Sequence, residues 1–202
     1  MGRYPEGAES TMEDGTKYAI GAGMSVNEAT KSRDNYVLEK ILQSLPDDFK
    51  GKELRILELG SGRGGMAKYI SATLKSQGRL KQYIACNISR VENNYNITSA
   101  KALGLEEPQY LVRYISFDDI FAEGTITRDD RFDVVVSCEA LCHSADRRAV
   151  LSNVKNLLVP GGVCFVSDVC VNADSPEEEI ATCKARFSDS TFASNKEYET
   201  NF

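Results

Sequence analysis

A glycine-rich loop with an acidic residue at its start is the stretch best suited to chemistry. The residues Glu58-Leu59-Gly60-Ser61-Gly62-Arg63-Gly64-Gly65 follow a short apolar run and precede apolar residues at helical spacing. Glycines let the chain turn sharply and let a ligand touch the backbone. A cluster of glycines at a strand-to-helix switch therefore predicts a cofactor site rather than a plain turn.

Two cofactor classes match the glycine spacing. Gly60, Gly62 and Gly65 fit the G-x-G-x-x-G pattern of dinucleotide-binding loops. Gly60, Gly62 and Gly64 fit the G-x-G-x-G pattern typical of loops that bind S-adenosylmethionine. A glycine pattern alone is weakly specific, so the flanking residues must decide between the two.

The flanks of the loop favour a cationic ligand. The carboxylate of Glu58 would repel a pyrophosphate, whereas it suits the ammonium and sulfonium groups of S-adenosylmethionine. A dinucleotide site also prefers an acid after the second strand, and Asn87 stands there. These residues indicate S-adenosylmethionine, with a nicotinamide dinucleotide as the alternative.

Two further residues could act on a substrate. His143 is the one histidine of the chain and follows the fourth expected strand, and its pKa near neutrality suits a general base. Glu139 stands four residues earlier and could attract a cationic amine or orient the cofactor. The alternatives are a structural histidine in the loop and a solvated or helix-capping acid.

The cysteines do not predict a metal site. Cys138, Cys142 and His143 are spaced C-x-x-x-C-H, which is neither a zinc pattern nor a haem attachment pattern. The chain has six cysteines, and its polar first residues do not form a signal peptide. We therefore expect free thiols, no bound metal and a cytoplasmic location.

Strand-like and helix-like segments alternate along the chain. Capping boxes at Ser25–Glu28 and Ser89–Glu92 mark two helix starts, and Asp146 can cap a third helix. Alternation of this kind predicts an α/β fold with a doubly wound, mostly parallel open sheet. The expected strands are 54–59, 83–86, 110–115, 132–137 and 163–166, with a turn at Pro160-Gly161-Gly162 between the third helix and the last strand.

Length and charge limit the organisation and the partners. The chain has 202 residues, and its composition predicts a flexible arm over 1–17 and a single domain over 18–202. The net charge is −6, so we expect no nucleic-acid partner. No apolar run approaches the roughly 20 residues of a spanning helix, so we expect no integral membrane association.

Four motifs in this order resemble the class I S-adenosylmethionine-dependent methyltransferases: ILELGSGRGG at 56–65, ACNISRVENN at 85–94, FDVVVSCEALCHSAD at 132–146 and LLVPGGVCFVSDV at 157–169. The second and third are similar to sarcosine/dimethylglycine N-methyltransferases. GAGMSVNEAT at 21–30 and the glycine loop are similar to phosphoethanolamine methyltransferases. The run EALCHSAD is also similar to sterol side-chain methyltransferases.

The resemblance implies roles for residues at the ends of the expected strands. They are Glu58, Gly60, Ser61 and Gly62 at the methionine moiety, Asn87 at the ribose, Ile88, Ser116 and Phe117 at the adenine, and the backbone of Ser137 and Cys138 near the methionine. Asp118 is a neighbouring candidate. Many relatives carry an acid where this chain has Asn87, which is expected to weaken the cofactor site.

The resemblance also implies a lid and a shortened C-terminus. Tyr18 lies in the segment that folds over the active site in phosphoethanolamine methyltransferases, where a tyrosine could assist deprotonation; an ordinary packed aromatic is the alternative. We expect the antiparallel strands with which the family ends to be absent from this sequence. The last parallel strand would then be an unpaired edge, which a homodimer could cover.

The expected function is methylation of a small molecule. The first expectation is N-methylation of an amine such as glycine, sarcosine, dimethylglycine or phosphoethanolamine. The alternatives are a C- or O-methyltransferase of a lipid-like, sterol-type substrate, and a catalytically incomplete domain that only binds S-adenosylmethionine.

Overall fold

Five parallel strands form the centre of the molecule. The computed structural model describes residues 8–11, 17–20, 26–122, 124–171, 174–186, 193–194, 198 and 200. The sheet order is β5-β4-β3-β6-β7, and every neighbouring pair is parallel. The strands are β3 (Leu54–Leu59), β4 (Leu80–Asn87), β5 (Tyr110–Tyr114), β6 (Phe132–Cys138) and β7 (Leu158–Ser167).

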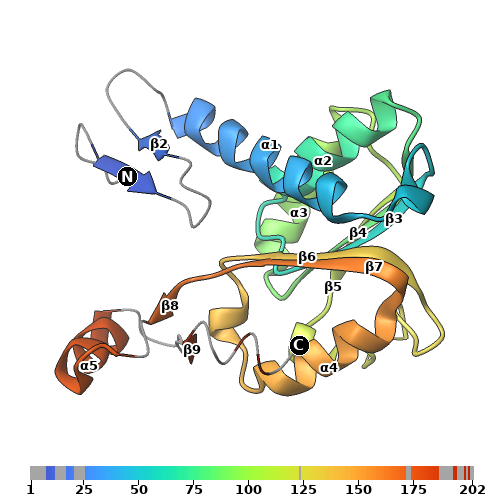
Figure 1. The fold of residues 1–202 in the computed structure, drawn as a ribbon. Helices are drawn as coiled ribbons and strands as arrows, with labels where there is room; N and C mark the ends of the chain where they lie inside the picture. The colour runs from blue at the N-terminus through green and yellow to red at the C-terminus, as the bar shows by residue number, and fades with distance from the viewer. Residues whose placement is uncertain are drawn as a thin grey trace.

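Helices cover both faces of the sheet, as expected for a doubly wound fold (Figure 1). Three of them lie on one face: α1 (Val26–Ser44), α2 (Gly65–Ser76) and α3 (Arg90–Lys101). The opposite face carries α4 (Arg147–Leu157). Each face has its own apolar core. Ile56 packs in one and Leu57 in the other, so successive residues of β3 are buried on opposite sides.

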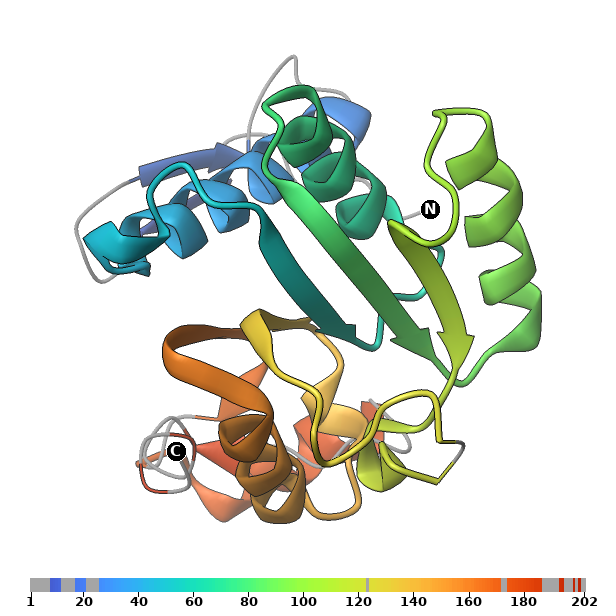
Figure 2. The same ribbon diagram turned by 90° about the vertical axis from the view of Figure 1, so that its right-hand side faces the viewer.

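The strand order places the ends of the strands at one edge. The order in which the strands join the sheet reverses at β3. β4 and β5 lie on one side of β3, and β6 and β7 lie on the other. The teal, green and yellow-green arrows of β3, β4 and β5 point to the same edge in Figure 2. Open α/β sheets bind ligands at this position, just beyond the carboxyl ends of the strands.

Two of the observed strands are longer than predicted by several residues, while β5 and β6 differ from the prediction by one residue each. β4 begins at Leu80, three residues before the predicted start, and ends at Asn87. β7 begins at Leu158 and runs through 160–162, where the sequence predicted a turn. Its register against β6 shifts between Phe132 and Val134, so the extra residues form a bulge. Pro160 is tolerated there because β7 is an edge strand in the described part of the sheet, with only β6 beside it.

Shorter elements flank the sheet. The N-terminal part contains an antiparallel pair, β1 (Ala8–Thr11) and β2 (Lys17–Ile20). After β7 come β8 (Cys170–Val171), α5 (Glu177–Arg186) and β9 (Ala193–Ser194), and β8 pairs with β9 in parallel. Among the described residues, no helix is both long and apolar enough to cross a membrane.

Side-chain caps start two helices where the sequence placed them. Ser89 Oγ accepts from the backbone N–H of Glu92 at 3.3 Å, and Asp146 Oδ1 accepts from that of Ala149 at 3.0 Å. These bonds satisfy N–H groups that the first turn of a helix leaves unpaired. Ser25, the third expected cap, lies outside the described residues.

The cap of α4 can be tested by mutation. Asp146→Ala should lower the free energy of unfolding by about 1 kcal/mol, because the first turn loses its hydrogen-bond acceptor. Denaturant unfolding measures the change, with Asp129→Ala at an exposed loop position as the control. Equal losses in the two variants would contradict the assigned cap.

Candidate functional site

The glycine loop is tied to the end of the neighbouring strand. The backbone N–H groups of Gly60 and Ser61 both donate to the carbonyl of Cys86, each at 2.9 Å. Gly60, Gly62 and Gly64 have φ values of 76°, 51° and 71°, a region that strongly favours glycine. The loop therefore needs its glycines for backbone conformation alone.

Two of these glycines are also needed for close packing. A Cβ on Gly60 would overlap the Cβ of Ala140, in the connection between β6 and α4. A Cβ on Gly64 would overlap the side chain of Asn96 on α3. The loop is thus pressed between two other connections of the sheet edge.

Gly62 and Ser61 leave room and hydrogen-bonding capacity for a ligand. A Cβ on Gly62 would meet no other atom of the described structure within 4 Å. Ser61 Oγ is buried and has no hydrogen-bond partner among the described residues. A buried hydroxyl normally has a partner, so an unpartnered one in the loop fits a bound polar group.

Glu58 is a buried carboxyl at the end of β3. Its residue is 3% exposed, and Oε2 accepts a hydrogen bond from the hydroxyl of Tyr83 at 2.9 Å. Burial raises its pKa from 4.5 to about 7, and nearby Asp34 adds to the rise, while Tyr83 and Arg33 oppose it. At neutral pH the group is therefore poised between its neutral and charged forms.

Helix α1 adds two charged residues that the sequence analysis did not identify. Asp34 is 3% exposed, and its Oδ1 lies 2.9 Å from Nη2 of Arg33. Nη1 of the same arginine lies 3.9 Å from Oε1 of Glu139. Their place among the polar residues of an amphipathic helix gave no signal, because only the fold brings α1 against the loop after β6.

Glu139 has an unusual backbone conformation. Its φ is 53°, the one positive value at a non-glycine residue of the described chain, and its N–H donates to the carbonyl of Ser167 at 2.7 Å. Its side chain is 66% exposed. Directly after β6, Glu139 thus combines a strained backbone with an accessible carboxylate. Backbone strain of this kind is concentrated at functional sites.

Asn87 ends β4 beside the glycine loop. Its Nδ2 donates to Glu92 Oε2 at 3.1 Å, with a longer contact of 3.5 Å to the carbonyl of Gly62. Its own carbonyl accepts from Nδ2 of Asn93 at 3.0 Å. Ile88, which follows it, is 62% exposed. The predicted ribose and adenine positions therefore lie next to the loop, and Glu92 and Asn93 are new neighbours.

The segment after β5 organises the loop after β6. Ser116 caps the 3-10 helix Phe117–Asp119, and Phe117 packs against the core near Gly60. Asp118 Oδ1 accepts from Ser144 Oγ at 2.6 Å and from the N–H of Ala145 at 3.2 Å. The carboxylate of Asp118 thus binds the residues that follow His143 and orders the connection between β6 and α4.

The remaining predicted residues lie on β6 or after it. Ser137 is buried and donates from Oγ to the carbonyl of Leu59 at 3.2 Å. Burial raises the pKa of the Cys138 thiol to about 12, so it stays neutral. His143 is exposed at the end of the 3-10 helix Leu141–His143, and its N–H donates to the carbonyl of Ala140 at 3.0 Å. For Tyr18 the structure describes only the backbone, in β2.

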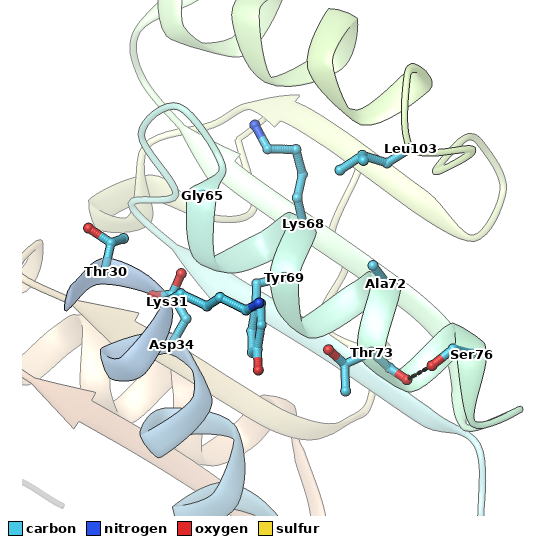
Figure 3. A pocket seen from close by; sticks show the side chains of 10 residues that line it. All are labelled: Thr30, Lys31, Asp34, Gly65, Lys68, Tyr69, Ala72, Thr73, Ser76 and Leu103. Atoms are coloured by element: carbon cyan, nitrogen blue, oxygen red, sulfur yellow. Dashed lines mark hydrogen bonds between the residues drawn. The ribbon is translucent and has the colours of Figure 1, made fainter. Parts of the chain in front are cut away.

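A groove of about 640 Å³ borders the candidate site, and Asp34 and Gly65 are among the residues that line it (Figure 3). It runs along α2 from Gly65 to Ser76, with Thr30 and Lys31 of α1 on one side and Leu103 on another. It contains none of the cofactor residues expected from the sequence. We therefore place the functional site at the sheet edge, where the loops converge.

The burial of Glu58 predicts a dependence of stability on pH. Its pKa is higher in the folded than in the unfolded chain, so its contribution is full below about pH 4.5 and is lost as pH rises through about 7. Wild type should therefore lose more stability between pH 5 and pH 8 than Glu58→Gln. Denaturant unfolding at both pH values tests this.

The exposed Glu53→Gln variant is the control for Glu58. Its free energy of unfolding should change between pH 5 and pH 8 by as much as that of the wild type. If Glu58→Gln loses as much stability between pH 5 and pH 8 as the wild type does, Glu58 titrates as an ordinary surface carboxyl.

Comparisons with known proteins agree with this geometry. Residues 30–193 match the family described as "Methyltransferase domain". The chain is 33% identical over 129 residues to the glycine/sarcosine/dimethylglycine N-methyltransferase of Actinopolyspora halophila, which covers 63% of this chain and 21% of that protein. It is 34% identical over 122 residues to the dimethylglycine N-methyltransferase of Parasynechococcus marenigrum, covering 60% and 39%.

A solved structure has the same fold. It is that of a protein from Galdieria sulphuraria named as a sarcosine dimethylglycine methyltransferase, with a TM-score of 0.74 and 22% identity over 88% of this chain and 62% of that one. The chain thus spans less than half the length of the two curated relatives it matches. The family match covers most of the chain. The chain belongs to the methyltransferase-domain family, and its fold is that of the class I S-adenosylmethionine-dependent methyltransferases.

Proposed function

We propose that this chain transfers a methyl group from S-adenosylmethionine to the nitrogen of a small amine. The observation that carries the proposal is the group of carboxyls at the sheet edge. Glu58 and Asp34 are buried there, and Glu139 is exposed within ion-pair distance of Arg33. This excess of acid suits a cationic cofactor and a substrate amine that is cationic in water.

The glycine loop would hold the methionine part of the cofactor. Gly62 offers open space, Ser61 offers an unpartnered buried hydroxyl, and Glu58 offers a carboxyl for the ammonium group. Gly60 allows the loop to lie against Ala140. The backbone of Ser137 and Cys138 would border the same space from β6.

The remaining cofactor contacts would come from the next two strand ends. Asn87 would accept from a ribose hydroxyl, and exposed Ile88 would pack on the adenine, with Ser116 and Phe117 near the same base. Ile88 is 62% exposed in the described structure, and a large apolar side chain at a ligand-binding edge favours covering by a flat ring.

The chemistry demands little beyond alignment and one proton acceptor. When bound, S-adenosylmethionine supplies a methyl group activated by its positively charged sulfur. The chain must hold the amine in line with that methyl group and exclude water. The amine must also lose a proton, because only its free lone pair can form the new N–C bond.

The connection from β6 to α4 would supply the substrate side. Ala140 contacts Gly60, and His143 follows in the same short helix, so the imidazole is carried on a segment packed against the cofactor loop. We infer that His143 accepts the proton of the amine and that Glu139 attracts its positive charge. Tyr18 could assist deprotonation from the N-terminal segment.

The names of the two sequence relatives support an amine acceptor, since both are N-methyltransferases of glycine derivatives. The direct test incubates the purified chain with S-adenosylmethionine carrying a labelled methyl group and, in turn, glycine, sarcosine, dimethylglycine and phosphoethanolamine. Label in one amine supports the proposal. A parallel incubation contains a sterol in place of the amine. Label only in the sterol would replace the proposal with C- or O-methylation, and binding without any transfer would indicate a domain that is catalytically incomplete.

The loop prediction compares two glycines of similar backbone conformation. Gly62→Ala should weaken binding of S-adenosylmethionine at least tenfold, because its Cβ would fill ligand space. Gly51→Ala is the matched control: its φ is 76° and its Cβ also meets nothing within 4 Å, but it lies outside the site. Both variants should lose similar stability. Affinities for S-adenosylmethionine are measured by calorimetric titration. Equal affinities of the two variants would contradict the assignment of the methionine moiety to Gly62.

The proton acceptor is tested by removing the imidazole. His143→Ala should lower turnover by about 10²- to 10⁴-fold and leave the affinity for S-adenosylmethionine nearly unchanged. Steady-state rates and a calorimetric titration of the same preparation separate the two effects. Turnover equal to that of the wild type would remove His143 from the mechanism.

A further inference from the structure

The first turn of α3 places a carboxylate, Glu92, beside the end of β4, and the resemblance assigned no role to it. Asn87, the residue expected at the ribose, carries no charge itself. In the structure Glu92 Oε2 lies 3.1 Å from Nδ2 of Asn87. The carboxylate of Glu92 therefore lies directly beside the Asn87 amide, at the end of the strand.

Glu92 does not complete the capping box in which the sequence placed it. In a full capping box the glutamate would accept from the N–H of the capping residue. Here Ser89 Oγ still accepts from the N–H of Glu92, but the carboxylate of Glu92 is turned toward Asn87. The local helix signal alone does not explain this orientation.

The Asn87 side chain has one hydrogen-bonding group left for a ligand. A primary amide has two N–H donors and one oxygen acceptor. The Asn87 donors are directed at Glu92 and, at the longer distance of 3.5 Å, at the carbonyl of Gly62. The oxygen Oδ1 therefore remains as an acceptor, which is what a ribose hydroxyl requires.

The backbone of Asn87 is held as well. Nδ2 of Asn93, which is 5% exposed, donates to the carbonyl of Asn87 at 3.0 Å and to that of Arg113 on β5 at 3.4 Å. The first turn of α3 thus holds Asn87 twice, once through each of two adjacent residues. The backbone of Asn87 is fixed by Asn93, and the orientation of its side-chain amide is set by Glu92 and, more weakly, by the carbonyl of Gly62.

We propose that Glu92 is a positioning residue for ribose recognition, which holds the Asn87 amide so that its oxygen accepts a hydroxyl of the cofactor ribose. This inference rests on the proposed binding of S-adenosylmethionine. The carboxylate of Glu92 also strengthens the amide as an acceptor, because a charged partner polarises the group to which it is bonded.

Binding of the product S-adenosylhomocysteine is the measurement, because it requires no methyl acceptor and no turnover. Glu92→Ala should weaken binding about tenfold, the usual effect of one hydrogen bond to a charged group. Glu92→Gln should weaken it less, since the new amide oxygen can still accept from Asn87. Glu106→Ala, at an exposed position beyond α3, is the control and should bind as the wild type does.

A second arm separates positioning from simple support of the fold. The 2′,3′-dideoxy analogue of S-adenosylhomocysteine has no ribose hydroxyls, so wild type should bind it about tenfold more weakly than the parent compound. Glu92→Ala should bind the analogue almost as tightly as it binds the parent compound, because the hydrogen bond to the ribose is already weakened in this variant. A penalty for the missing hydroxyls that is equal in the two proteins would overturn the role of Glu92.

An exchange of the two groups provides a rescue. Asn87→Asp alone places two carboxylates together and should weaken binding by repulsion. The double variant Asn87→Asp with Glu92→Gln restores one acid and one amide and should recover most of the affinity. Failure of the rescue in a variant that melts like the wild type would contradict the pairing.

The outcomes for this inference and for the proposed function are distinct. No binding of S-adenosylhomocysteine to the folded wild type would overturn the proposed function and, with it, the role of Glu92. Normal binding to wild type and to Glu92→Ala alike would overturn the role of Glu92 only.

Discussion

Burial of the Glu58 carboxyl is the constraint around which the candidate site is arranged. A carboxyl so deeply buried needs hydrogen-bond and charge partners, and they come from parts of the chain that are distant in sequence. Tyr83 reaches it because β4 pairs with β3 in a register that sets Tyr83 beside Ile56. Arg33 approaches from α1, whose position depends on packing over the same face of the sheet.

The loops at the sheet edge support one another. The glycine loop is bonded to the end of β4, touches the β6–α4 connection at Ala140 and packs against α3 at Asn96. Asp118 orders the residues that follow His143. A cofactor bound in this loop would therefore contact the segment that carries the proposed base, which is how a rigid scaffold aligns a cofactor with its substrate.

The charges at this edge of the sheet come from residues other than Asn87. The negative charge absent from position 87 is present at Glu92, and a further carboxyl is buried at Glu58. Arg33 lies beside Asp34 and Glu139 and limits the repulsion among these acids. The site thus combines acidity toward a cationic ligand with hydrogen bonds that hold each acid in place.

The sequence by itself determined the features that depend on neighbouring residues. The bounds of β3, the caps at Ser89 and Asp146, the glycine loop and the alternation of strands and helices all follow from local spacing and turn chemistry. Only the tertiary structure decided that β7 continues through a bulge, that Arg33 and Asp34 reach the sheet edge, and that Glu92 turns from its own helix to Asn87. Arg33 and Glu139 are distant in the sequence, so only the packing of α1 on the sheet brings them together. Asn87 and Glu92 are five residues apart, but the capping-box pattern predicts another partner for Glu92, so the local pattern does not encode this contact.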